Sequence, residues 1–347
     1  MSRASEPQID AAQRLRLRAA RWSLAVGLLV FGGKLAAYLL TDSTAVFSDA
    51  MESVVNIAAA AVLLLSLRLA AQPADRDHPY GHGKVEFFSA GIEGAFLLGA
   101  GIWIAVEAVG AFVVGSTVHS LNIGVAFLVG FSVINAALGV HLVRTGEATH
   151  SLALVADGKH VLADVWTTAG VIIGLAAVEV TGWGVLDPLI ALAVAVNIMR
   201  ESRNLLREAV RGLMDEADEP LLEEIAASFD VGRPAEWIDV HGLRSRRSGP
   251  LVHADLHLVV PRYFDVQRLH VLHEDIEIAV RQAVRGTAET VVHFDPCRVS
   301  DCPRCRVSHC PVRAAVPAGP GYEITLERAT RSDATAEPDA EPVEANS

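Results

Sequence analysis

Six long stretches of mostly apolar residues fill the chain between about residues 22 and 200, and they constrain its fold more than any other feature. A helix that crosses the hydrocarbon core of a bilayer needs about 20 such residues. We therefore predict six transmembrane helices, of which the last is short unless it continues toward Leu206. The predicted spans are Trp22–Leu40, Ala45–Leu69, Phe87–Val114, Leu121–Val143, Leu152–Val180 and Val185–Met199.

The basic residues beside these stretches predict their orientation. Lys and Arg precede the first stretch, lie between the second and third and between the fourth and fifth, and follow the sixth. The other three connections, 41–44, 115–120 and 181–184, contain neither Lys nor Arg. Because cytoplasmic loops carry the excess of Lys and Arg, we expect a multi-pass integral protein of the plasma (inner) membrane with both termini in the cytoplasm.

Composition limits what the rest of the chain can be. A hydrophobic share of 51% and a charged share of 20% exclude a purely soluble enzyme, a coiled coil and a disordered chain. The net charge of -12 argues against a nucleic-acid partner, since nucleic acid requires a basic surface.

We expect a cytoplasmic N-terminal segment (1–18), a six-helix transmembrane domain (19–214), a cytoplasmic domain (215–296), a Cys-rich metal-binding extension (297–316) and a disordered acidic tail (317–347).

Two of the apolar stretches carry ionisable side chains in the same spacing. Ionisable groups at membrane depth are costly, so each is a functional candidate. Residues at i, i+3 and i+7 share one face of a helix, so each stretch presents a polar stripe. Since lipid would satisfy neither stripe, we expect the two stripes to face each other. Their members are Asp49, Glu52 and Asn56 in the second stretch, and Asp157, His160 and Asp164 in the fifth.

Carboxylates, an amide and an imidazole together suit a divalent transition metal such as Zn, Fe, Co or Mn. The alternative is a polar network that only joins helices, but five ionisable groups in two matched stripes favour a metal site. Four other charged residues in the apolar stretches are not assigned as ligands, because structural pairing explains them better. These are Lys34, Glu93, Glu107 and Glu179.

The connection between the second and third stretches offers a second cation site. Asp75, His78 and His82 form an Asp-x2-His-x3-His pattern, and Gly81 and Gly83 permit a tight turn between them. The alternative is an ordinary solvated loop.

The polar region after residue 215 has the pattern of a small α+β domain. We predict helices at Glu219–Phe229 and Val266–Val284, and strands at Trp237–Arg244, Val252–Val260 and Thr290–Asp295. This order is ferredoxin-like. Alternation in the second strand turns Ala254, Leu256 and Leu258 inward and His253 and His257 outward. Six of the 13 histidines lie between His241 and His293, which favours a metal site built from several elements.

All four cysteines follow within 14 residues, which is typical of a metal site rather than a disulfide framework. Four thiolates are sufficient for a closed tetrahedral zinc site. An iron–sulfur cluster is a less favoured reading, because the fourth cysteine follows too soon, and free thiols are a third. The four are Cys297, Cys302, Cys305 and Cys310.

From about Ala19 to Pro296 the sequence resembles the cation diffusion facilitator family of divalent-metal transporters. The resemblance rests on Ser-Asp-Ala-Met-Glu-Ser-Val-Val-Asn at 48–56, His-Pro-Tyr-Gly-His-Gly-Lys at 78–84, Ala-Asp-Gly-Lys-His-x3-Asp at 156–164 and the histidine-bearing C-terminal domain. It implies a homodimer that exports metal from the cytoplasm by proton antiport and is not an enzyme. Divalent metal would be both the substrate and a regulatory ligand.

The resemblance also assigns residues. It implies a transport site at Glu52, Asn56, His160 and Asp164. It further implies a loop site at Asp75, His78 and His82. A binuclear cytoplasmic site would fall on His241, His257, His270, His293 and Asp295.

One departure from the family pattern concerns the transport site. Many members have Asp where Asn56 stands, and Asn is a neutral, weak ligand. Either the ion lies about one turn away, on Asp49 and Asp157 with Glu52 and His160, or the site prefers a harder ion such as Fe(II) or Mn(II).

The two polar stripes are compatible with two functions. Because carboxylates and His bind metal only when deprotonated, protons and metal compete for one site, so a site open alternately to each side could couple their movements. The alternative is an intramembrane metal-dependent hydrolase, in which the metal activates water. The absence of a His-Glu-x2-His motif and the paired stripes favour the transporter.

Overall fold

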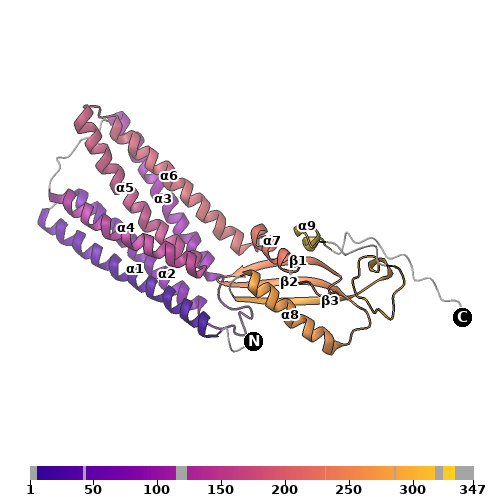
Figure 1. Cartoon of the computed structure of the whole chain (residues 1–347). Coiled ribbons are helices and arrows are strands. Elements are labelled where there is room, and N and C mark those ends of the chain that lie inside the picture. The colour runs from indigo at the N-terminus through magenta and orange to yellow at the C-terminus, as the bar shows by residue number, and fades with distance from the viewer. Residues whose placement is uncertain are drawn as a thin grey trace. The chain divides into compact units, whose positions relative to one another are not determined.

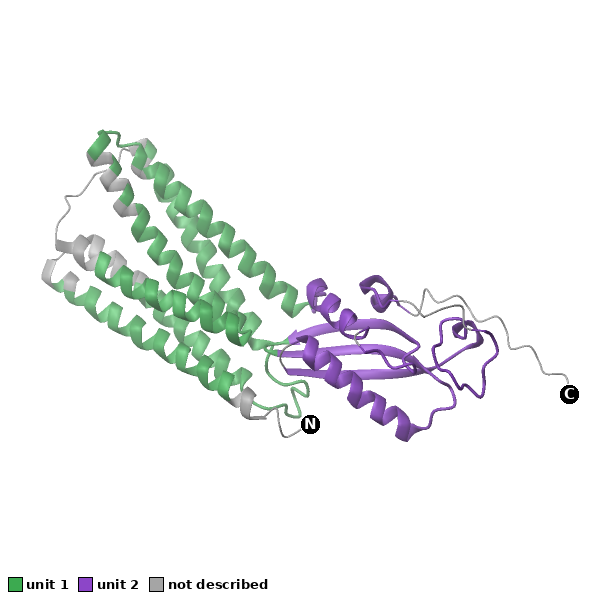
Figure 2. Ribbon diagram, viewed as in Figure 1, with its two compact units in different colours: residues 1–214, 248–250 green, residues 215–247, 251–347 purple. Residues whose placement is uncertain are grey.

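The computed structural model describes residues 6–41, 44–114, 123–230, 232–284, 287–316 and 323–332. The chain divides into two compact units (Figure 2): residues 1–214 with 248–250, and residues 215–247 with 251–347. The boundary near residue 214 is also where the composition changes from apolar to polar.

Six long helices form the described part of the first unit (Figure 1). The last of them continues well beyond the predicted end at Met199. The helices are α1 (Glu6–Thr41), α2 (Thr44–Ala70), α3 (Val85–Val114), α4 (Ile123–Thr149), α5 (Leu152–Thr181) and α6 (Leu186–Leu213).

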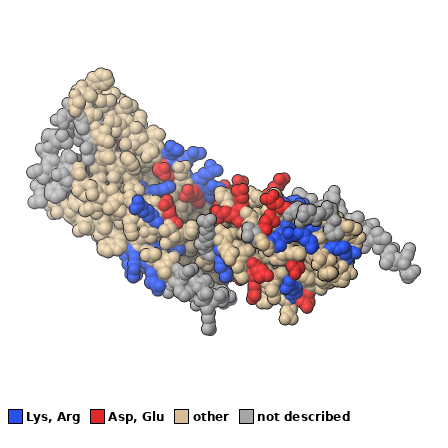
Figure 3. Space-filling model, in the orientation of Figure 1, with Lys and Arg blue, Asp and Glu red and all other residues tan. Residues whose placement is uncertain are grey.

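Three of these helices, within the part of the chain that the structure describes, are long and apolar enough to cross a membrane. The apolar segments are Ala11–Ala36 in α1, Ser53–Ala70 in α2 and Val85–Gly110 in α3. On the face seen in Figure 3, the Lys, Arg, Asp and Glu side chains of this unit gather at one end and leave a wide uncharged surface. The first unit is therefore a helical membrane domain, and the count of six spans stays a prediction.

Close backbone contact joins α4 to α5. A Cβ atom added at Gly158 would lie 2.8 Å from the backbone nitrogen of Val143 and 2.9 Å from the carbonyl oxygen of Gly139. One added at Gly146 would lie 2.8 Å from the backbone nitrogen of Val155. Small residues at such contacts allow two helices to approach more closely than larger side chains would. The arrangement holds α5, with its polar stripe, in a fixed position.

The second unit is a three-stranded sheet with helices. Its elements are α7 (Glu219–Ser228), β1 (Asp239–Ser248), β2 (Leu251–Val260), α8 (Val266–Val284), β3 (Thr287–Pro296), a 3-10 turn (Val299–Asp301) and α9 (Leu326–Thr330). The strand order is β1-β2-β3, and β2 and β3 pair in parallel through the α8 crossover. The order of helix, two strands, helix and strand is as predicted, and α8 has the predicted bounds.

The core of this unit combines one face of the sheet with the apolar sides of the helices. Phe229, Leu258 and Ile276 are fully buried in it. Two details differ from the expected pattern. Val266 is apolar but exposed, because it is the first residue of α8. His253 was expected to face outward but is buried.

Part of the predicted disordered tail is ordered. Helix α9 lies within residues 317–347, and Ile324 and Ala329 are buried in the core of the second unit. Arg328 Nε lies 3.1 Å from the buried Asp239 carboxylate, and Arg331 contacts the same group at 3.6 Å. Two apolar anchors and a paired buried charge thus fix a segment whose composition predicts disorder.

Candidate metal sites

The polar stripes of α2 and α5 contact each other inside the helical unit. Asn56 Nδ2 donates a hydrogen bond of 2.5 Å to Asp164 Oδ2, and Asn56 Oδ1 lies 2.9 Å from His160 Nε2. His160 is buried and the other two side chains are half-buried. Asp49 and Glu52 belong to α2, but their side chains lie outside the described part of the structure.

Asp157 shares a helix with this cluster but has another partner. Its buried carboxylate accepts a hydrogen bond of 2.6 Å from Ser23 Oγ on α1. The spacing of the α5 stripe grouped Asp157 with His160 and Asp164. The structure shows that this end of the stripe faces α1.

A carboxylate on α3 joins the cluster instead. Glu93 is fully buried, and its Oε2 lies 3.4 Å from His160 Nδ1. Glu93 was not predicted as a ligand, because structural pairing was the better explanation for a single charge in this apolar stretch. The available signal was an acidic residue in the interior of an apolar span, and only packing identifies what it faces.

The loop residues Asp75, His78 and His82 converge as their spacing predicted. One ligand atom from each lies within 4.8 Å of the others. Asp75 Oδ1 accepts hydrogen bonds from the backbone N–H of His78 at 2.7 Å and of Asp77 at 2.9 Å. The hydrogen bond from the His78 N–H is the main reason that the pKa of Asp75 lies below its ordinary value. The carboxylate is therefore held in its charged, metal-binding form.

Gly81 makes this loop possible. Its φ of 82° lies in the left-handed region, which favours glycine. Its N–H donates to the carbonyl of His78 at 2.9 Å, which closes the turn that returns His82 to Asp75. His82 Nε2 then lies 3.4 Å from Asp75 Oδ2.

A third cluster lies across the three strands of the second unit. His241 on β1, His257 on β2 and Asp295 on β3 each place a ligand atom within 4.8 Å of the others. His257 Nδ1 lies 3.0 Å from Asp295 Oδ2, and His241 Nε2 lies 3.6 Å from the same atom. Adjacent strands bring these residues together because side chains alternate between the two faces of a sheet.

His293 adjoins this cluster and His270 does not. The sheet register pairs His293 with His257, and their rings stack at 4.6 Å. His293 Nε2 also lies 3.4 Å from Asp295 Oδ1. His270 is exposed on α8, where its contact is with Glu274 at 3.9 Å.

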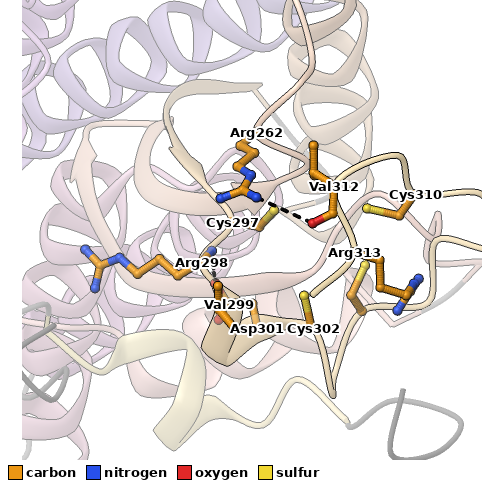
Figure 4. Close-up of a pocket in the computed structure, with 10 residues that line it drawn as sticks. Arg262, Cys297, Arg298, Val299, Asp301, Cys302, Cys310, Val312 and Arg313 are labelled. Atoms are coloured by element: carbon orange, nitrogen blue, oxygen red, sulfur yellow. Dashed lines mark hydrogen bonds between the residues drawn. The ribbon is translucent and has the colours of Figure 1, made fainter. Parts of the chain in front are cut away.

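The four cysteines line one pocket beyond β3 (Figure 4). All four are free thiols; Cys302 and Cys305 are buried, whereas Cys297 and Cys310 are half-buried. Burial raises the pKa of the Cys297 thiol. Among the described residues, no three of these sulfur atoms all lie within 4.8 Å of one another, whereas the ligand atoms of the two histidine clusters do. A tetrahedral zinc site here requires the thiols to move closer together.

Comparison with known families matches both units. Residues 20–214 match the family described as the cation efflux transmembrane domain. Residues 218–297 match the cytoplasmic domain of cation efflux proteins. The two matches meet at the boundary between the two compact units.

Individual proteins are similar over most of their length. The chain is 38% identical to an uncharacterized transporter of Synechocystis sp. over 274 residues, which is 79% of this chain and 88% of that protein. It is 31% identical to the cation-efflux pump FieF of Serratia proteamaculans over 85% of this chain and 96% of the pump. The corresponding pump of Pectobacterium atrosepticum is 30% identical over 82% of this chain and 93% of the pump.

Proposed function

Because this chain belongs to the cation diffusion facilitator family of cation-efflux transporters, we propose that it exports a divalent transition-metal cation by proton antiport. The cation would be Zn, Fe, Co or Mn, and the protein would work as a homodimer by alternating access. Its six helices α1–α6 would span the plasma (inner) membrane with both termini in the cytoplasm. The family assignment does not favour the intramembrane metal-dependent hydrolase.

The observation that carries this proposal is the contact between Asn56 on α2 and His160 and Asp164 on α5. An oxygen of an amide, an imidazole nitrogen and a carboxylate meet inside a helical membrane domain, where polar groups are costly. Glu52 lies one turn before Asn56 on the same helix and completes the proposed ligand set. The alternative set of Asp49 and Asp157 has less support, because Asp157 is hydrogen-bonded to Ser23.

The ligands explain how proton movement would drive metal export. His160 and Asp164 must lose their protons to bind a cation, so binding at the cytoplasmic side releases protons into the protein's surroundings. On the opposite side, protons would displace the cation. Coupling then requires only that the site opens alternately to the two sides.

Metal-resolved flux in proteoliposomes tests the proposal, with Zn, Fe, Mn, Co and Cd compared side by side under an imposed pH gradient. We expect the wild type to move at least one of these ions and to move protons in the opposite direction. Asp164→Ala should abolish both movements. Asp77→Asn, which changes an exposed loop carboxylate outside the proposed ligand sets, serves as the control. Full proton-coupled flux in Asp164→Ala would reject the assignment.

The cytoplasmic unit would sense metal. We propose that His241, His257, His293 and Asp295, with His270 toward a second ion, bind cytoplasmic metal and tighten the dimer. The convergence of His241, His257 and Asp295 supports the site. Sedimentation of the full chain in detergent should show tighter dimers with Zn than with a chelator, and no metal dependence would count against this role.

We propose two further metal sites. The loop triad Asp75, His78 and His82 would bind a cation beside the helical unit. The cysteine pocket would hold a structural Zn, for which the shared lining of one pocket by four free thiols is the support.

A further inference from the structure

Glu93 is a buried carboxylate that neither the family's motifs nor the ligand set above uses. It lies in the interior of α3, at 0% exposure, and neither of its oxygens accepts a hydrogen bond from the residues that the structure describes. A buried carboxylate whose oxygens accept no hydrogen bond is costly. The buried position of Glu93 is therefore best explained by the role of His160, which it contacts.

The imidazole of His160 lies between two different partners. Its Nε2 lies 2.9 Å from Asn56 Oδ1, on the side of the proposed ion, and its Nδ1 lies 3.4 Å from Glu93 Oε2. These partners come from α2 and α3, while His160 is on α5. The two ring nitrogens thus face separate groups on separate helices.

This arrangement has a known chemical use. A histidine that binds metal through one ring nitrogen usually donates the N–H of the other to a carboxylate, which fixes the tautomer and the ring orientation and makes the histidine a stronger ligand. Asn56 Oδ1 accepts and cannot donate, so the 2.9 Å contact is a bond from His160 Nε2–H. When a cation replaces that proton, a bond from Nδ1–H to Glu93 would leave the Nε2 lone pair available to the cation.

We infer that Glu93 is a positioning residue for the transport site: it accepts the Nδ1–H of His160 and supplies from α3 the negative charge that Asn56 does not provide from α2. The inference rests on the proposed function, since it needs an ion at His160. Asp157, the other buried carboxylate nearby, is hydrogen-bonded to Ser23 and is less available for this task. A role that only joins α3 to α5 would not require a carboxylate facing a ligand histidine.

The test measures zinc flux in proteoliposomes as a function of zinc concentration, so that half-maximal concentration and maximal rate are obtained separately. Glu93→Gln removes the charge and keeps the shape. We expect it to raise the half-maximal concentration about 10–100-fold, as loss of such a partner does elsewhere, with a smaller change in maximal rate. Glu107→Gln, an exposed carboxylate on the same helix, is the matched control and should leave both values unchanged.

A rescue makes the test specific. Asn56→Asp combined with Glu93→Gln returns one carboxylate to the site and should recover most of the lost affinity. Glu93→Asp keeps the charge on a shorter side chain, so it should fall between wild type and Glu93→Gln, and it covers the case in which Glu93→Gln does not fold.

The outcomes separate the two claims. Wild-type values for Glu93→Gln, or a fall in maximal rate at constant half-maximal concentration, would overturn the inference and leave the transporter intact. Absence of flux in the wild type would reject the proposed function, and the inference with it.

Discussion

Asn56 donates a hydrogen bond of 2.5 Å from its amide nitrogen to the carboxylate of Asp164, which joins α2 directly to α5. An aspartate in place of Asn56 would instead place two carboxylates at this distance, and like charges repel strongly in a poorly solvated site. An amide at position 56 therefore stabilises the contact between α2 and α5, whereas a carboxylate there would bind a cation more strongly. Helix packing and metal binding thus favour different residues at this position.

Asn56→Asp should therefore shift this balance in a measurable way. The variant loses a hydrogen bond to a charged group, worth about 1.5–3 kcal/mol, and gains a negative charge. We expect a lower unfolding temperature in detergent with chelator, recovery of that temperature with zinc, and a lower half-maximal zinc concentration for flux.

Asn135→Asp is the control for this experiment, because it adds a charge to α4 outside the cluster. Zinc should not restore its stability. If zinc fails equally with Asn56→Asp, the cation does not bind beside Asn56.

The cytoplasmic cluster predicts a different response to mutation. His257 contacts Asp295 at 3.0 Å and stacks on His293, so His257→Ala removes the central member of the cluster. We expect equilibrium dialysis of the full chain to show at least about tenfold weaker zinc binding at this site and loss of zinc-dependent dimer tightening. His273→Ala, on α8, should behave as wild type. Unchanged dimer tightening in His257→Ala would place the regulatory ion elsewhere.

Sequence patterns predicted the contacts that a periodic spacing marks and missed those that carry no such signal. The i, i+3, i+7 spacing of α2 and α5 anticipated the contact between Asn56 and His160, because both partners lie on apolar helices with matched stripes. Glu93 has no such periodic signal, and only the packing of α3 against α5 reveals its partner. Likewise, the spacing groups Asp157 with the polar stripe of α5, and only the packing of α1 shows that its hydrogen-bond partner is Ser23.

His253 predicts a pH-dependent stability of the second unit. The pKa of His253 lies below 6.5, mainly because the side chain is buried and secondly because of the charge of Arg246. The carboxylates of Glu289, Asp255 and Asp215 act in the opposite direction and raise the pKa. The unfolded chain therefore binds a proton at a higher pH than the folded chain does. As the pH falls below about 6.5, the free energy of unfolding should fall until the pH reaches the folded pKa, and then level off.

Hydrogen exchange of the β2 and β3 amides in the full chain measures this effect, after correction for intrinsic exchange. Between pH 7.5 and 5.5, wild type should lose protection, and His253→Gln should lose less. His273→Gln should lose as much as wild type. Equal losses in all three proteins would show that His253 is not the responsible group.

The contact between α4 and α5 predicts opposite effects for two alanine substitutions. A Cβ at Gly158 would meet the backbone of both Val143 and Gly139 at less than 3.0 Å, whereas a Cβ at Gly110 on α3 would meet no described atom within 4 Å. Gly158→Ala should cost about 1–3 kcal/mol through overpacking and should reduce flux, because it displaces α5 and its ligands. Gly110→Ala should be neutral or slightly stabilising. Thermal unfolding in detergent and flux in proteoliposomes measure both, and equal behaviour of the two variants would contradict the close contact.

The cysteine pocket predicts a zinc ion that is independent of transport. Cys297 is anchored by its backbone N–H to the carbonyl of Val260 at 2.8 Å, while Cys302, Cys305 and Cys310 lie on the extension that follows. A zinc ion that gathers these thiols would fix the extension to the sheet, so Cys302→Ser with Cys305→Ser should lose one zinc per chain by native mass spectrometry. The same variant should become sensitive to limited proteolysis within residues 297–316, and Ser300→Ala should not. Zinc should also protect the wild-type thiols from alkylation. Visible absorbance after anaerobic reconstitution with iron and sulfide, in place of zinc retention, would assign the pocket to an iron–sulfur cluster instead.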